Sequence, residues 1–138
     1  MKLKSMLLAA LLASGALPAQ AAVIYDASSD LAGNQAYTDN LGLDFTVNSS
    51  IFVTALGAYD DDPDGILGNV EVAIWSLDEQ TWVTPFISFG GSAATGDSAY
   101  VFKDIASVVL GPGNYSVIGR GFNVVDLNFN TNFPPYVN

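Results

Sequence analysis

The stretch LGLDFTVNSSIFVTALGA, residues 41–58, decides the fold class of this 138-residue chain. Its first seven residues alternate, which predicts a β-strand with one apolar face, formed by Leu41, Leu43, Phe45 and Val47. Small polar residues at 48–50 then predict a turn. The run from Ile51 to Ala58 is apolar on both faces, so we expect a central strand that is covered on two sides.

Further β-type runs recur about every ten residues, separated by Gly, Asp, Asn, Ser and Pro. No helical periodicity of useful length occurs after Ala22. The expected strands cover residues 70–75, 82–89, 100–105, 108–110 and 115–119. We therefore predict an all-β chain that forms an antiparallel β-sandwich, jelly-roll or immunoglobulin-like, of about seven to eight strands.

Residues 1–21 have the features of a cleaved secretory signal peptide. Lys2 and Lys4 form a short basic region, an apolar run follows from Met6 to Leu17, and residues 19–21 are an A-x-A cleavage pattern. The apolar run is shorter than the roughly 20 residues that span a bilayer. We therefore expect an exported protein, periplasmic, at the cell surface or extracellular, with no stable membrane span in the mature chain.

Removal of residues 1–21 leaves 117, which is the size of one domain. All fourteen acidic residues remain but only two of the four basic ones, Lys103 and Arg120, so the mature net charge is −12. Such a surface repels nucleic acid and anionic lipid and attracts cations. We expect a β-sandwich domain over residues 22–122. The Asn- and Pro-rich residues 123–138 are expected to be a loose tail at the start of a missing C-terminal part.

The absence of Cys and His excludes several kinds of chemistry. Disulfides, thiol nucleophiles, Ser-His-Asp triads and ordinary zinc or copper sites are ruled out. A glycoside-active enzyme is a distant alternative, since no catalytic pair stands out among Asp44, Glu71, Asp97 and Asp104. We therefore expect a protein that is not an enzyme, with no catalytic residues and no organic cofactor.

Residues 58–72, AYDDDPDGILGNVEV, place four aspartates within five residues. The stretch matches the calcium-loop pattern D-x-[DN]-x-[DN]-G-x₅-E, although its flanks resemble strands and not the helices of an EF-hand. Without a cation, each pair of crowded carboxylates is destabilised by about 1–4 kcal/mol. A solvated turn closed by Asp-Gly is the other interpretation. We predict a structural calcium ion held by Asp60, Asp62, Asp64, the carbonyl of Ile66, and Glu71.

Trp75 and Trp82 flank an expected hairpin connection at residues 78–80. If Asp78 pairs with Thr81, the two indoles lie diagonally on one face, roughly 7–8 Å apart. This face is opposite to the core-facing side chains of Val70, Val72 and Ile74. Together with Tyr100, exposed indoles would stack on sugar rings as in a carbohydrate-binding module. Packing in the core or at a sheet edge is the more common fate of tryptophan.

Several segments resemble exported bacterial proteins of the PEP-CTERM sorting group. They are IYDASSD, LGLDFTV, VTALGAYD, the Asp-Gly loop, VAIWS and LGPGNYSVIGRGF, within residues 22–122. The resemblance implies a secreted β-sandwich that is sorted toward the cell surface or exopolysaccharide. The Pro-Glu-Pro motif, apolar helix and basic tail of that group do not occur before Asn138. We therefore expect either a fragment or a related module without the sorting signal.

These patterns together predict a secreted or cell-surface, non-catalytic β-sandwich module that is stabilised by calcium. Extracellular polysaccharide is the expected partner. The alternative function is a carbohydrate-binding module that uses Trp75, Trp82 and Tyr100.

Overall fold

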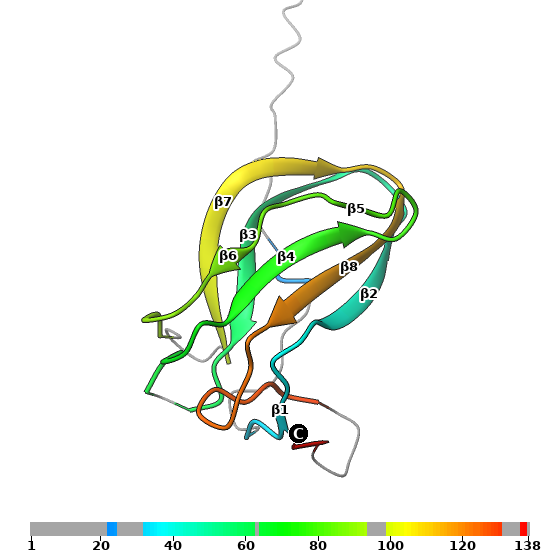
Figure 1. Cartoon of the computed structure of the whole chain (residues 1–138). Coiled ribbons are helices and arrows are strands. Elements are labelled where there is room, and N and C mark those ends of the chain that lie inside the picture. Colours follow the sequence, from blue (N-terminus) through cyan, green and yellow to red (C-terminus); the bar gives the residue numbers. More distant parts are fainter. Residues whose placement is uncertain (1–21, 25–31, 63, 94–98, 131–135, 138) are drawn as a thin grey trace, which may run out of the picture.

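The computed structural model describes residues 22–24, 32–62, 64–93, 99–130 and 136–137 (Figure 1). The predicted signal peptide, residues 1–21, lies outside these ranges and stays a prediction. The described residues form strands and no helix, which confirms the predicted all-β class. The strands are β1 (Gln35–Ala36), β2 (Leu41–Val47), β3 (Ile51–Tyr59), β4 (Glu71–Ser76), β5 (Thr81–Trp82), β6 (Ile87–Ser88), β7 (Tyr100–Leu110), β8 (Gly113–Arg120) and β9 (Tyr136–Val137).

The strands are arranged as an antiparallel sandwich of two unequal layers. The larger layer, here called the main sheet, has five strands in the order β2-β8-β4-β5, and β6 also pairs with β4. The smaller layer, here called the ribbon, is the pair β3-β7. Figure 1 shows the ribbon behind and beside the main sheet, with β7 strongly curved. The short strands β1 and β9 form a separate parallel pair.

Strand alternation places the core between the two layers. In β4, Val72 and Ile74 face the core, so Glu71 and Trp75, on either side of them, point to the outer face of the main sheet. The matching face of the ribbon is also apolar. Its buried side chains are those of Leu56, Ala58, Val101 and Leu110.

The prediction that residues 51–58 form a central strand covered on two sides is wrong. Among the described strands, β3 pairs with β7 alone. One of its faces is open, because Phe52 is 73% exposed and lies opposite the exposed Val109. The apolar residues on both faces of β3 therefore reflect a ribbon with one buried face and one exposed apolar face.

Two strand boundaries also differ from the sequence pattern. Residues 100–110 form one strand and not two, because β7 residues 105–107 lie opposite the single residue Thr54 in a bulge that bends the strand without ending it. The strand expected over residues 82–89 is instead split into β5 and β6. Between them, the Thr84 Oγ1 accepts a hydrogen bond of 2.9 Å from the amide of Ile74, and Pro85 has no amide to donate.

Residues 123–130, which the sequence pattern assigned to a loose tail, pack against the sandwich. The amide of Gln35 donates to the carbonyl of Asn128 at 3.0 Å, and the amide of Asn128 donates back to the Gln35 carbonyl at 2.9 Å. The Asn34 side chain likewise donates to the carbonyl of Asn130 at 2.7 Å and accepts from its amide at 2.8 Å. The packed domain therefore continues at least to Asn130, beyond the boundary expected after Phe122.

Candidate functional site

The structure brings the two tryptophans together on the outer face of the main sheet. Trp75 on β4 lies directly opposite Trp82 on β5, and Ser76 lies opposite Thr81. The connecting loop is therefore 77–80, longer than a turn that would pair Asp78 with Thr81, and Gln80 in it has a φ of 51°. The two indoles meet edge to face, with ring centroids 4.9 Å apart. The pair is direct and not diagonal, but it shares one face as expected.

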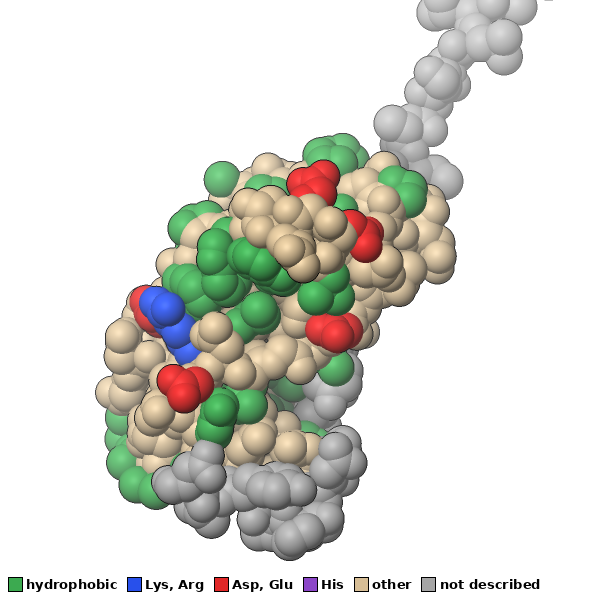
Figure 2. Space-filling view, turned by 45° about the vertical axis from the view of Figure 1, so that its right-hand side comes forward, with side chains coloured by type: hydrophobic (Ala, Val, Ile, Leu, Met, Phe, Trp, Pro, Cys, Tyr) green, Lys and Arg blue, Asp and Glu red, His purple; other side chains and the backbone are tan. Residues whose placement is uncertain are grey.

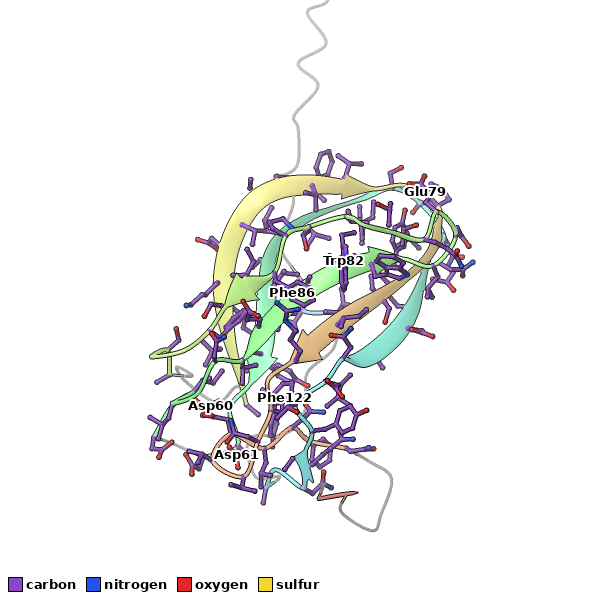
Figure 3. The ribbon with its side chains drawn as sticks, viewed as in Figure 1. Asp60, Asp61, Glu79, Trp82, Phe86 and Phe122 are labelled. Carbon is purple, nitrogen blue, oxygen red and sulfur yellow. The ribbon has the colours of Figure 1, made fainter. Side chains whose placement is uncertain are left out.

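Phe86 and Arg120 extend this pair along the sheet. The Phe86 ring centroid lies 4.7 Å from that of Trp82, and Figure 3 shows the two side chains side by side over β4. The Arg120 guanidinium lies 3.7 Å from the Phe86 ring centroid. Its Nη2 and Nε atoms are 2.7 Å and 2.8 Å from Glu71 Oε2. We call Trp75, Trp82, Phe86, Arg120 and Glu71 the aromatic face.

The aromatic face offers both apolar and polar contacts to a ligand. Trp82 is 42% exposed although it contacts two other rings. Large exposed aromatic side chains beside fixed charged groups are typical of binding surfaces. The ion pair of Arg120 and Glu71 holds the guanidinium against Phe86, so the polar groups are fixed relative to the rings.

Tyr100 lies in the ribbon and not on the aromatic face. Its ring is 5.6 Å from that of Tyr59 and 6.1 Å from that of Phe102, centroid to centroid. The structure thus joins two of the three aromatic residues that we expected to bind sugar.

The sequence pattern did not identify Phe86 as a site residue, because Phe86 lies in a run that we interpreted as one strand. Pro85 was a signal that the strand breaks there. The position of Arg120 depends on the pairing of β4 with β8, which joins distant segments.

The aspartate-rich loop follows β3 at the other end of the sandwich (Figure 3). Asp60 is buried, and its amide donates to the carbonyl of Ala99 at 2.9 Å. Asp62 Oδ1 accepts a hydrogen bond from the amide of Asp64 at 3.1 Å, which is the local bond of an Asx turn. Gly65 has a φ of +86°, where a side chain would be strained and would also meet Ala93.

Two of the five predicted calcium ligands have other partners. Ile66 is buried in the core, and its carbonyl accepts a hydrogen bond from the amide of Gly91 at 2.8 Å. Glu71 lies on β4 and binds Arg120, as described above. Among the described residues, no three acidic side chains are arranged to hold a metal ion. The expected set of five is therefore not assembled, and calcium binding by the aspartates stays a prediction.

An aspartate that is distant in the sequence is hydrogen-bonded to the end of the aspartate-rich loop. Asp126 is 3% exposed, and its two carboxylate oxygens accept hydrogen bonds from the amides of Leu67 and Gly68, each at 2.7 Å. Sequence patterns missed it because 58 residues separate Asp126 from Gly68. We call Asp60, Asp61, Asp62, Asp64 and Asp126 the acidic turn.

The charges of the acidic turn alter the acidity of its members. The pKa of Asp64 is raised to about 6, first by its hydrogen bond with the Asp62 carboxyl and then by slight burial and the charges of Asp62, Asp60 and Asp126. The same hydrogen bond lowers the pKa of Asp62. Burial raises the pKa of Asp61, and its Oδ1 accepts from the Leu127 amide at 3.3 Å. The two candidate regions therefore carry different chemistry, one mainly aromatic and one anionic.

No family model, curated protein or solved structure matches the chain. Within the described residues, no helix is long and apolar enough to cross a membrane. Any assignment of a ligand therefore depends on the fold and on these two regions.

Proposed function

We propose that the chain is an exported, non-catalytic module that binds carbohydrate on its aromatic face. Export follows from the signal-peptide pattern of residues 1–21 and from the resemblance to the PEP-CTERM group. That resemblance also suggests cell-surface or exopolysaccharide association. The chemistry of the ligand comes from the aromatic face itself.

The observation that carries the proposal is the Trp75–Trp82 pair on the outer face, with Trp82 42% exposed. The pair stands outside the main core cluster, to which β4 contributes Val72 and Ile74 from the opposite face. Exposure of an indole to water is unfavourable by roughly 25 cal/mol per Å² of apolar surface. The apolar face of a pyranose ring would cover that surface, while its hydroxyl groups would bond to neighbouring polar side chains.

The test is affinity electrophoresis of the purified protein in gels that contain a soluble polysaccharide. Retardation is expected for the unaltered protein and is expected to be lost in Trp82→Ala. Phe52→Ala is the matched control, because Phe52 is an exposed aromatic residue on the ribbon. If Trp82→Ala and Phe52→Ala migrate alike in every polysaccharide, the aromatic face does not bind sugar.

A second candidate function is calcium stabilisation of the acidic turn. The observation that favours it is Asp126, a fifth carboxylate that is buried and bonded to the amides of Leu67 and Gly68, just after the four aspartates of the loop. Asp126 would take the place of Glu71 as the distant acidic partner. The ion would relieve the repulsion among these carboxylates and would stabilise the fold according to its free concentration.

Thermal unfolding in millimolar calcium and in EDTA tests this second function. We expect a higher Tm with calcium, and no difference for the double variant Asp62→Ala/Asp64→Ala. Asp104→Ala, at an exposed position on β7, is the control and should keep the calcium effect. Identical Tm values for the unaltered protein in calcium and in EDTA would contradict calcium binding.

A further inference from the structure

The strand register places a row of side chains across the outer face of the main sheet. Trp82 is opposite Trp75, Trp75 is opposite Ser116, and Ser116 is opposite Asp44 on β2. Side chains at directly opposed positions share one face of the sheet. Neighbouring strands are about 4.8 Å apart, so Asp44 lies two strands, about 10 Å, from Trp75. A bound sugar chain that lies across the strands would contact the two tryptophans and Asp44, whereas Ser116 between them is buried.

A second acidic group stands at the loop end of the same face. Asp78, in the loop between β4 and β5, accepts hydrogen bonds from the amide and the side chain of Asn114, at 2.8 Å and 3.0 Å. These bonds lower the pKa of Asp78 and favour its charged form. Glu79 is exposed in the same loop. Asp44 therefore lies across the same face from the tryptophan pair, and Asp78 and Glu79 lie in the loop that joins the strands of the two tryptophans.

The positive charges of the described residues do not balance these acids. Arg120 is paired with Glu71. Lys103 on β7 donates to the carbonyl of Ser88 at 2.8 Å and lies over the Phe89 ring. Figure 2 shows hydrophobic side chains gathered on one face, with separate acidic side chains around them and a basic side chain at one margin.

We infer that the ligand of the aromatic face is an uncharged polysaccharide and that acidic polysaccharides are rejected. This inference rests on the carbohydrate-binding function proposed above. Carboxylates accept hydrogen bonds and cannot donate them, so they suit the hydroxyl groups of neutral sugars. A uronate carboxylate or a sulfate group offers acceptors only and repels Asp44, Asp78 and Glu79. Asp44 is thus a specificity-determining residue.

The experiment compares retardation in gels of neutral polysaccharides (a β-glucan, a xylan and a mannan) with retardation in gels of alginate and polygalacturonate. We expect retardation by at least one neutral polymer and by neither acidic polymer. The variant Asp44→Lys should increase the affinity for alginate roughly tenfold, because it replaces repulsion by attraction at the margin of the aromatic face. Asp104→Lys, on the ribbon, is the control for net charge and should leave alginate binding unchanged.

The outcomes separate this inference from the proposed function. Retardation of the unaltered protein by acidic polymers, equal to or greater than that by neutral ones and lost in Trp82→Ala, would overturn the inference and leave the proposed function standing. Equal gains in alginate affinity for Asp44→Lys and for Asp104→Lys, which change the net charge by the same amount, would also overturn it, since the effect would then be one of net charge. If no polymer retards the protein, the proposed function fails and the inference fails with it.

Discussion

The aromatic face and the acidic turn differ in how the chain assembles them. Trp75 and Trp82 belong to two strands joined by the loop 77–80, so their contact is local in sequence. The acidic turn is completed by Asp126, which comes from a segment on the far side of β7 and β8 in the chain. Local pairing is visible in a sequence pattern, whereas a long-range contact depends on the topology.

Glu71 shows the difference most clearly. A calcium-loop pattern assigns it to the acidic turn, because it occupies the last position of that pattern. Strand alternation assigns it to the outer face, because Val70 and Val72 on either side of it are buried. The structure follows the alternation and pairs Glu71 with Arg120. Burial of two valines therefore decides the side-chain direction more strongly than a twelve-residue motif.

Replacement of Asp126 by Ala has the largest expected effect and tests the long-range contact that completes the acidic turn. The variant would leave the amides of Leu67 and Gly68 without their acceptor in a part-buried site and would remove a buried side chain, that of Asp126. We expect a loss of about 3 kcal/mol in the free energy of unfolding, measured in urea. Asp104→Ala, at an exposed position, should change it by less than about 0.5 kcal/mol. Equal losses for the two variants would show that Asp126 does not fasten the C-terminal segment to the loop.

Glu71→Gln gives a smaller effect and tests which region Glu71 serves. The ion pair is partly exposed, with 42% of the Arg120 side chain and 23% of the Glu71 side chain accessible. We expect the free energy of unfolding to fall by about 0.5–1 kcal/mol. Any rise in Tm with calcium should be the same as in the unaltered protein, as followed by calorimetry. If Glu71→Gln alone abolishes the rise in Tm with calcium, Glu71 is a calcium ligand together with the acidic turn.

The smallest expected effect is a dependence on pH at the acidic turn. The pKa of Asp64 is raised to about 6 in the folded protein, so between about pH 4 and pH 6 the folded state binds more protons than the unfolded state. The contribution of Asp64 to stability therefore falls as the pH rises through this window. Asp64→Asn should flatten the corresponding fall in Tm, measured without calcium. A steeper fall in the variant would contradict the assignment.

Much of the fold was predictable from the sequence, because it is determined by local alternation. The strand at 41–47 and the strand expected at 70–75, which is β4 (Glu71–Ser76) in the structure, follow from side chains a few residues apart. Two features were not predictable in this way. The open face of β3 depends on the ribbon having two strands, and the split after Trp82 depends on the bond between Thr84 and Ile74.

The residues of the candidate sites also divide into those that local sequence patterns predict and those that they do not. The shared face of Trp75 and Trp82 follows from strand alternation and the hairpin, although the exact register required the loop conformation around Gln80. Phe86 joins them only because the chain leaves the sheet at Pro85 and returns at β6. Asp126 could not be found by any local pattern, since its partners lie 58 and 59 residues away.

The most direct measurement of the central claim is the NMR signal of the two indole N–H groups during a titration with neutral oligosaccharide. The chain has two tryptophans, so Trp82→Phe assigns both signals. If the aromatic face binds sugar, the Trp82 indole signal shifts and saturates, while the amide signals of the acidic turn stay in place. Indole signals that do not move while amides elsewhere shift would show that the ligand binds at another surface.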